Sequence, residues 1–338
     1  MRFLVTGHTG FKGTWLTMYL KYLGHTVSGL SIGSEPHWLC NQVNLKGMLT
    51  DEYIGDVRDW EFVKQSFRSS EFDAVVHLAA QSLVRESFRR PRFTFETNVQ
   101  GTLNVLESYF ELNRRVPILI VTTDKVYRND GRRQGYIESD ALGSSDPYSA
   151  SKAMADLMTQ SLQELYSDFP IAIARAGNVI GGGDVSKERL LPDLMNAIQQ
   201  GLTPHLRLPN AIRPWQHVLD CLNGYYKILE ALVISPTQLG AWNIGPAQEN
   251  IKSVRELTEL VQDKMNVQRS WNQTGNDDMP ESDFLLLDSS KARRDLGWDD
   301  LLSFEESVEW TVNWYRSVQK GAMPREATMG DIERFLSL

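Results

Sequence analysis

A hydroxyl, a carboxylate and an amine follow one another near the middle of the chain, as Thr123, Asp124 and Lys125. The apolar run before them, residues 117–121, predicts a buried strand. Ligands of open α/β sheets bind at the carboxyl ends of the strands. Thr123 could therefore hydrogen-bond a hydroxyl that is being oxidised, while Asp124 and Lys125 could serve as acid and base, in either order. A surface turn with an internal ion pair is the alternative.

A glycine-rich turn near the amino terminus suggests a cofactor. Gly7, Gly10 and Gly13 form a Gly-x-x-Gly-x-x-Gly motif between the apolar residues 2–6 and a helical pattern. Glycines permit a tight turn and let the backbone approach a pyrophosphate, which binds at a helix amino terminus. The motif predicts a dinucleotide site, and a glycine turn kept for packing is the alternative.

A Tyr-x-x-x-Lys pair, Tyr148 and Lys152, completes the chemistry. Residues four apart share one helix face. A tyrosine of ordinary pKa, about 10, is a poor base at neutral pH. A neighbouring ammonium and a positive nicotinamide ring would both favour the phenolate. Tyr148 could then take a proton from a sugar hydroxyl while its carbon loses hydride, and Lys152 could also hold the nicotinamide ribose.

The expected cofactor is NAD. The strand expected at residues 26–31 lacks the terminal Asp or Glu that usually holds the adenosine ribose, and it also lacks a basic residue for a 2′-phosphate. Asp56 could accept a hydrogen bond from the adenine amino group or cap a helix. The other expected cofactor contacts are Thr9, Phe11, Lys12, Ser31, Val57, Leu78, Ala79 and Ala80.

Size and charge exclude several classes. The chain has 338 residues, of which 41% are hydrophobic and 23% charged, and its net charge of −8 disfavours a nucleic-acid or anionic-membrane partner. No apolar run reaches the roughly 18–20 residues that span a bilayer, and no signal peptide is expected. Two unpatterned cysteines, Cys40 and Cys221, indicate a cytoplasmic protein. The histidines show no metal-ligand spacing, so no metal is expected.

Strand and helix signals alternate along the first half. Strands are expected at residues 2–6, 26–31, 50–55, 73–78, 117–122 and 170–175, and helices near 12–23, 59–69, 92–113 and 148–166. Such alternation predicts a doubly wound, Rossmann-type parallel sheet. We expect residues 1–175 to form the dinucleotide-binding domain, with about 213–245 returning to it. Residues 176–338 should mainly form a smaller α/β substrate-binding lobe.

Together these motifs resemble those of the extended short-chain dehydrogenase/reductases that act on nucleotide sugars, and within them the CDP-glucose 4,6-dehydratases. Besides the glycine motif, the resemblance lies in residues 123–127, 175–184 and 213–218, and it covers nearly the whole chain. It implies a lyase that binds NAD and dehydrates a nucleotide-diphosphate hexose, most narrowly CDP-glucose. The steps implied are C4 oxidation, loss of water across C5–C6 and hydride return to C6. The chain departs from the subgroup at Val185, where a tryptophan is usual.

The resemblance also assigns residues. Thr123, Asp124, Lys125, Tyr148 and Lys152 fall on catalytic positions. Asn178 falls on a position that contacts the substrate phosphates, and Arg213 on the arginine that holds the diphosphate. The remaining expected substrate contacts are Gln81, Arg189 and Trp215. A homodimer joined through a four-helix bundle of helices 92–113 and 148–166 is implied too, although both helices could instead serve the monomer core.

Two other functions remain open. A nucleotide-sugar 4-epimerase or reductase would use Tyr148 and Lys152 but has no evident use for Asp124 and Lys125. A dinucleotide-binding regulator would keep the glycine turn without the catalytic groups. The usual destination of the dehydratase product is a deoxysugar of surface polysaccharide, such as the lipopolysaccharide O-antigen.

Overall fold

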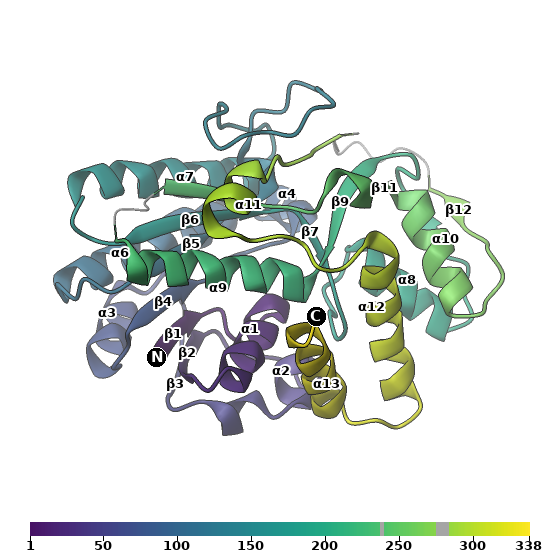
Figure 1. Ribbon diagram of the computed structural model, residues 1–338, viewed down its shortest axis with the longest axis horizontal. Coiled ribbons are helices and arrows are strands. Elements are labelled where there is room, and N and C mark those ends of the chain that lie inside the picture. The colour runs from purple at the N-terminus through teal and green to yellow at the C-terminus, as the bar shows by residue number, and fades with distance from the viewer. Residues whose placement is uncertain (237–239, 275–283) are drawn as a thin grey trace.

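A seven-stranded parallel sheet lies at the centre of the computed structural model, which describes residues 1–236, 240–274 and 284–338 (Figure 1). The strand order is β10-β6-β5-β4-β1-β2-β3. The strands are β1 (Arg2–Thr6), β2 (Thr26–Ser31), β3 (Glu52–Ile54), β4 (Ala74–His77), β5 (Ile118–Val121), β6 (Ile171–Ala176) and β10 (Gly240–Ile244). The order reverses between β1 and β4, as in a doubly wound nucleotide-binding sheet, and this confirms the predicted fold class.

Helices cover both faces of this sheet, because its strands are apolar on both sides. Helices α1 (Phe11–Tyr22) and α9 (Val218–Ile234) pack on one face. The other face carries α3 (Trp60–Ser69), α6 (Gly101–Glu111) and α7 (Pro147–Leu165). The short helices of this lobe are α2 (Leu39–Gln42), α4 (Val84–Arg89) and α5 (Pro91–Phe95).

The helix predicted at residues 92–113 is present but is not a uniform α-helix. It runs from α5 into α6 through a wider π-helical turn, Glu96–Gln100. The side chain of Asn98 in this turn is buried and holds Gln81 and Ser151 of α7 by hydrogen bonds of 2.8–3.0 Å. The irregular turn therefore serves a polar contact with the neighbouring helix, which apolar periodicity does not reveal.

A second lobe follows β6. Its three-stranded sheet has the order β11-β9-β7, and a two-stranded sheet pairs β12 with β8. The elements are β7 (Asn178–Ile180), β8 (His205–Leu206), β9 (Ile212–His217), β11 (Ile251–Ser253), β12 (Asn272–Gln273), α8 (Leu190–Gln199), α10 (Val254–Lys264) and α12 (Phe304–Gln319). The chain crosses back to the large sheet through α9 and β10, whereas β9 stays in the smaller sheet. Of the segment 213–245 that we expected to return to the first domain, β9 thus pairs in the smaller sheet, whereas α9 and β10 lie on the large one.

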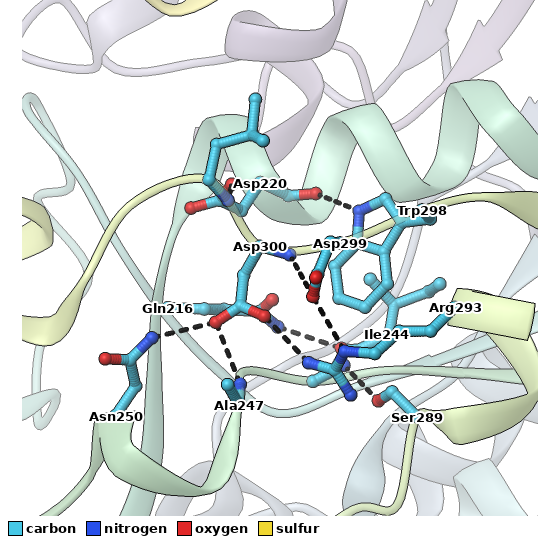
Figure 2. Close-up of polar contacts among 12 residues, drawn as sticks. Gln216, Asp220, Ile244, Ala247, Asn250, Ser289, Arg293, Trp298, Asp299 and Asp300 are labelled. Carbon is cyan, nitrogen blue, oxygen red and sulfur yellow. Dashed lines mark hydrogen bonds and ion pairs between the residues drawn. The ribbon is translucent and has the colours of Figure 1, made fainter. Parts of the chain in front are cut away.

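The carboxyl-terminal part ties the lobes together through α11 (Ser290–Leu296) and α13 (Pro324–Leu336), which pack on β10 and α1 respectively. A polar cluster fixes the segment after α11 (Figure 2). Asp300 accepts hydrogen bonds from Asn250 at 2.8 Å and from Arg293 at 2.7 Å. The indole of Trp298 donates to the Asp220 carbonyl, in the first turn of α9, at 3.1 Å.

Among the described residues, none of the helices combines the length and the apolar character that a membrane span needs.

Candidate active site

The carboxyl ends of the central strands open into a cavity of about 1160 Å³ between the two lobes. That volume is at the upper end of small-molecule sites, as a nucleotide sugar beside a dinucleotide would require. Both lobes contribute predicted residues to its wall. These are Phe11, Lys12, Leu78, Ala80, Thr123, Lys125, Tyr148, Lys152, Asn178, Arg189, Arg213 and Trp215.

Thr123, Asp124 and Lys125 form a compact group directly after β5. Thr123 caps a short 3₁₀ turn, Asp124–Val126, and its hydroxyl donates to Asp124 Oδ1 at 2.9 Å. The Lys125 ammonium donates to the same oxygen at 3.2 Å. The Asp124 side chain is 1% exposed and the Lys125 side chain 30%. The turn therefore lies inside the cleft and is not the surface turn that the sequence left open.

One oxygen of Asp124 is unused. Oδ2 is buried and has no hydrogen-bond partner among the residues that the structure describes. Gly177, at the junction of β6 and β7, faces it, since a Cβ there would lie 3.3 Å from Oδ2. A buried carboxyl oxygen without a partner is costly unless a ligand or water completes its hydrogen bonds. Asp124 is thus suited to exchange a proton with a bound molecule.

Tyr148 and Lys152 lie on the first turns of α7. Asp146 caps this helix by accepting a hydrogen bond from the Ser149 backbone at 2.9 Å. The Lys152 ammonium donates to the Val121 carbonyl at 2.9 Å, which fixes α7 against the end of β5. Both side chains are less than a tenth exposed and both line the cavity.

Burial dominates the protonation of this pair. It lowers the pKa of Lys152 to about 7, and the positive charge of Lys12 acts in the same direction. It raises the pKa of Tyr148 to about 12, although a hydrogen bond with Thr123 and the charge of Arg189 oppose the rise. The predicted lowering of the Tyr148 pKa is therefore not a property of the chain alone. It requires a further positive charge, as a bound nicotinamide ring would provide.

The glycine turn fits a dinucleotide. A Cβ at Gly7 would lie 2.7 Å from the Ala79 backbone nitrogen, and one at Gly13 would lie 2.1 Å from the Gly7 carbonyl oxygen, so protein packing requires both glycines. At Gly10 the nearest atom would be the Gly7 oxygen at 3.4 Å, an ordinary contact. The space beside Gly10 suits a pyrophosphate lying against the backbone. Gly10 has no side chain to cap α1, so the first N–H groups of that helix can bind the phosphates.

Other expected cofactor contacts lie in the glycine turn, at Thr9, and at the ends of β2 and β3. The Thr9 and Ser31 hydroxyls are hydrogen-bonded at 2.6 Å. Asp56 accepts from the Arg58 backbone at 2.9 Å and pairs with its guanidinium at 2.7 Å. Asp56 does not cap the helix, because the N-cap of α3 is Asp59, whose side chain accepts a hydrogen bond from the Phe62 backbone. Val57 is buried against Gly101.

Gln81 does not reach the cavity wall. Its amide nitrogen donates to the Leu83 carbonyl and to Thr94 at 3.0 and 2.9 Å, and its oxygen accepts from the Leu83 backbone at 2.6 Å. The side chain thus shapes the loop before α4, and its amide is fully engaged in doing so. The structure does not bring it together with the other expected substrate contacts.

Those contacts come from the second lobe. Asn178 begins β7, and Arg213 and Trp215 lie on β9. The Trp215 indole donates to the Lys252 carbonyl at 3.0 Å, which holds its ring in the wall. Arg189, just before α8, donates to Ser82 of the first lobe at 3.1 Å. Arg189 and Arg213 thus give the cavity two guanidinium groups, a combination suited to a diphosphate.

The sequence missed other residues of the wall. Arg85 on α4 and Arg207 after β8 also line the cavity. Neither belongs to a motif, and an isolated arginine in a short amphipathic segment is usually a solvated surface group. Only the approach of the two lobes brings them to the site.

Within the described residues there is no cluster of three or more His, Cys, Asp or Glu side chains that could hold a metal ion.

Comparisons with known proteins agree with this arrangement. The family model for GDP-mannose 4,6 dehydratase matches residues 4–311. The CDP-glucose 4,6-dehydratase of Salmonella typhimurium is 34% identical over 95% of this chain and 92% of its own. The crystal structure of DesIV, a dTDP-glucose 4,6-dehydratase from Streptomyces venezuelae with NAD bound, has a TM-score of 0.82 at 26% identity and covers 96% of this chain and 100% of its own.

An epimerase shares the fold. The UDP-glucose 4-epimerase of Bifidobacterium longum has a TM-score of 0.83, at 22% identity, and covers 95% of this chain and 100% of its own. That similarity concerns the fold alone, whereas the sequence matches extend through both lobes. The resemblance found in the motifs is confirmed, and this chain belongs to the GDP-mannose 4,6 dehydratase family.

Proposed function

We propose that this protein is an NAD-dependent hydro-lyase that converts CDP-D-glucose into CDP-4-dehydro-6-deoxy-D-glucose. One observation carries the proposal: Tyr148 and Lys152, the oxidation pair, line one cavity together with Thr123 and Lys125, and Asp124 is buried directly behind them, hydrogen-bonded to Thr123 and Lys125. An epimerase needs only the first pair. The choice of CDP-glucose among nucleotide sugars is supported by the Salmonella relative, which is named for that substrate.

The oxidation step uses α7 and the end of β5. Bound NAD would accept hydride from C4 of the sugar and return it to C6. Tyr148 takes the proton of the C4 hydroxyl, which Thr123 holds by a hydrogen bond. Lys152, already fixed to the Val121 carbonyl, orients the nicotinamide ribose and stabilises the phenolate. These roles make Tyr148 the base of the first step.

The elimination step uses the turn after β5. Oxidation at C4 makes the C5 hydrogen acidic, because the carbanion is stabilised by the ketone. Once its own proton has passed to Asp124, the neutral amine of Lys125, which lines the cavity, removes the C5 proton through Nζ and returns it to C5 when hydride reaches C6. Asp124, whose Oδ2 has no partner in the described structure, protonates the departing C6 hydroxyl. The reverse assignment of Asp124 and Lys125 uses the same two atoms.

We further propose a homodimer formed through α7 and the helical run of α5 and α6. The outer face of α7 carries exposed apolar side chains, which are Met154, Leu157 and Leu165 at 49, 51 and 70% exposure. Exposed apolar side chains that gather on one helix face can mark a protein–protein interface. The two cysteines are buried and unpaired, which fits a reducing compartment such as the cytoplasm.

The first experiment is mass spectrometry of CDP-, dTDP-, UDP- and GDP-glucose after incubation with the purified protein and NAD, without added reductant. Loss of one water from CDP-glucose alone supports the full proposal. Water loss from another donor keeps the chemistry and rejects CDP-glucose. An unchanged mass with inversion at C4 indicates an epimerase, and no product at all rejects both functions.

A further inference from the structure

A buried ion pair lies behind the catalytic turn. Arg175 on β6 and Asp156 on α7 are 1% and 0% exposed, and the guanidinium reaches both carboxylate oxygens, at 2.8 and 2.7 Å. Burial opposes the charge of Arg175, but Asp156 outweighs it and raises the pKa of the guanidinium. Buried pairs of this kind add little net stability compared with apolar packing. Their directional hydrogen bonds do impose a geometry on whatever they hold.

Both ends of the catalytic turn are attached to this pair. Thr122, immediately before the turn, donates from its hydroxyl to Asp156 Oδ2 at 3.0 Å. Tyr127, immediately after the turn, accepts at its hydroxyl from Arg175 Nη1 at 2.9 Å. The Tyr127 hydroxyl then donates to Asn243 Oδ1 on β10 at 2.6 Å. The segment that carries Thr123, Asp124 and Lys125 is therefore held at each end.

Asp156 of this pair also lies on α7, the helix that carries the oxidation groups. Asp156 follows Lys152 by one turn of α7, and Lys152 donates to the Val121 carbonyl at 2.9 Å. Three successive residues of the chain, Val121, Thr122 and Thr123, thus run beside α7, and the first two are bonded to it. Besides the Lys152–Val121 bond and the hydrogen bond between Tyr148 and Thr123, Asp156 and Arg175 therefore connect the elimination groups to the oxidation groups.

We propose that Asp156 and Arg175 are positioning residues that align Asp124 and Lys125 with Tyr148 and Lys152. The inference rests on the proposed function, because a dehydratase must present both sets of groups to one sugar. Displacing a reacting group by about 1 Å can reduce a rate about 100-fold. Oxidation should suffer less from a displaced turn than elimination, because oxidation uses only Thr123 from this segment, whereas elimination uses both Asp124 and Lys125.

Two tyrosines offer a matched test. The rings of Tyr127 and Tyr136 are stacked with their centroids 5.1 Å apart, and both residues are buried. Tyr127→Phe removes the hydroxyl that joins Arg175 to Asn243. Tyr136→Phe removes a hydroxyl that is hydrogen-bonded to the loop residues Asn129 and Asp130 and, within the described residues, not to the ion pair. The two variants lose the same atom from the same aromatic stack.

The readout is the balance between oxidation and elimination of CDP-glucose. In Tyr127→Phe we expect the rate of product formation to fall about 10-fold or more. The rate of C4 oxidation should stay within about twofold of the wild-type rate. Reduced cofactor should therefore accumulate on the enzyme. Tyr136→Phe should behave as the wild type. An equal loss of both steps in Tyr127→Phe, or no loss, overturns the proposal, because a purely structural role would not change their ratio.

Thr122→Val and crystal structures of the variants provide two further tests of the positioning role. Thr122→Val removes the other attachment at nearly constant volume, and it replaces Tyr127→Phe if that variant does not fold. Crystal structures of these variants should show Asp124 and Lys125 displaced relative to α7, whereas an unmoved turn overturns the positioning role. If the wild type dehydrates no nucleotide sugar, the proposed function fails by itself, and the crystal structures still decide the role of the pair.

Discussion

Lys125 and Asp124 form an ion pair at 3.2 Å in which the two partners differ sharply in exposure, 30% for the lysine and 1% for the aspartate. The lysine can therefore follow a substrate in the cavity, while the carboxyl group is held in place by Thr123. When the proton of the lysine passes to the aspartate along this contact, the asymmetry gives a mobile base and a fixed acid. It also means that the two side chains can be tested separately.

Lys125→Ala should stop the elimination and spare the oxidation. Loss of a general base typically costs about 100- to 10,000-fold, so dehydration should become undetectable in ordinary assays. The C4 hydroxyl can still be oxidised by the groups on α7, and the reduced cofactor should remain bound. The measurement is the near-ultraviolet absorbance of NADH after mixing the NAD-loaded variant with CDP-glucose.

Lys320→Ala, at an exposed position, is the control for removal of a lysine. It should dehydrate at the wild-type rate without an NADH signal. Dehydration by Lys125→Ala at the normal rate would show that Lys125 is not the base.

Tyr148→Phe should abolish both steps, and no NADH should appear. In the protein alone, burial raises the pKa of Tyr148 to about 12, so the phenol holds its proton at neutral pH. NAD brings a positive ring and should lower that pKa. A spectrophotometric titration of tyrosinate, taken as the difference between wild type and Tyr148→Phe, should move to lower pH when NAD is added. A titration that does not respond to NAD would remove Tyr148 from the base role.

Much of this site could be anticipated from the sequence because its motifs lie at strand ends. Thr123, Lys125, Tyr148 and Lys152 each follow a clear apolar or helical pattern, and a parallel sheet brings such positions together. Gln81 also comes after a strand, β4, but its side-chain amide is hydrogen-bonded to Leu83 and Thr94 and does not line the cavity. Local hydrogen bonds of this kind depend on loop geometry, which strand patterns do not encode.

The second lobe was harder to predict, for a physical reason. Arg207 follows the two-residue strand β8, which pairs with β12; the paired residues His205 and Asn272 are 67 positions apart in the chain. Pairings between such short strands leave no periodicity to read. The same holds for β9, which was expected near the large sheet and pairs instead with β7 and β11.

Alanine substitutions in the glycine turn should separate folding from cofactor binding. Gly13→Ala would place its Cβ 2.1 Å from the Gly7 carbonyl oxygen and should destabilise the fold by about 1–3 kcal/mol. Gly10→Ala meets only an ordinary contact at 3.4 Å and should unfold much as the wild type does. Its methyl group would occupy pyrophosphate space, so the Kd for NAD should rise about 10-fold or more.

Urea denaturation and calorimetric titration with NAD measure the two effects. Unchanged NAD affinity in Gly10→Ala would place the pyrophosphate elsewhere. Equal destabilisation by both variants would mean that Gly10, like Gly13, is required by packing.

Charges on the outer face of α7 should dissociate the proposed dimer. Met154→Glu with Leu157→Glu places two carboxylates on side chains that are about half exposed in one chain. Burying them at an interface would be strongly unfavourable, so the variant should sediment as a monomer while the wild type sediments as a dimer. Ile234→Glu is the control, since this 83% exposed residue at the end of α9 lies outside the proposed interface. A dimer that survives the α7 substitutions would require a different surface.

Asp220→Asn should change how stability depends on pH. Burial raises the pKa of Asp220 to about 7, and the nearby charge of Asp300 adds to the rise (Figure 2). Between about pH 4 and 7 the folded protein therefore keeps a proton that the unfolded chain has lost. By linkage, this group lowers the free energy of unfolding as pH rises through that window, and its effect is constant above it.

Asparagine cannot ionise, but its oxygen can still accept the hydrogen bond that Asp220 Oδ1 receives from the Leu301 backbone at 2.7 Å. The variant should therefore lack this downward slope and should exceed the wild type in stability above pH 7, by as much as about 4 kcal/mol. Urea denaturation of both proteins at a series of pH values measures the difference. Burial also raises the pKa of Asp331 to about 7. Asp331 contributes the same slope to the stability curves of both proteins, so its effect cancels when the two curves are compared. Parallel curves would mean that Asp220 is already ionised in the folded protein near pH 5 and that another group or a bound water stabilises its charge.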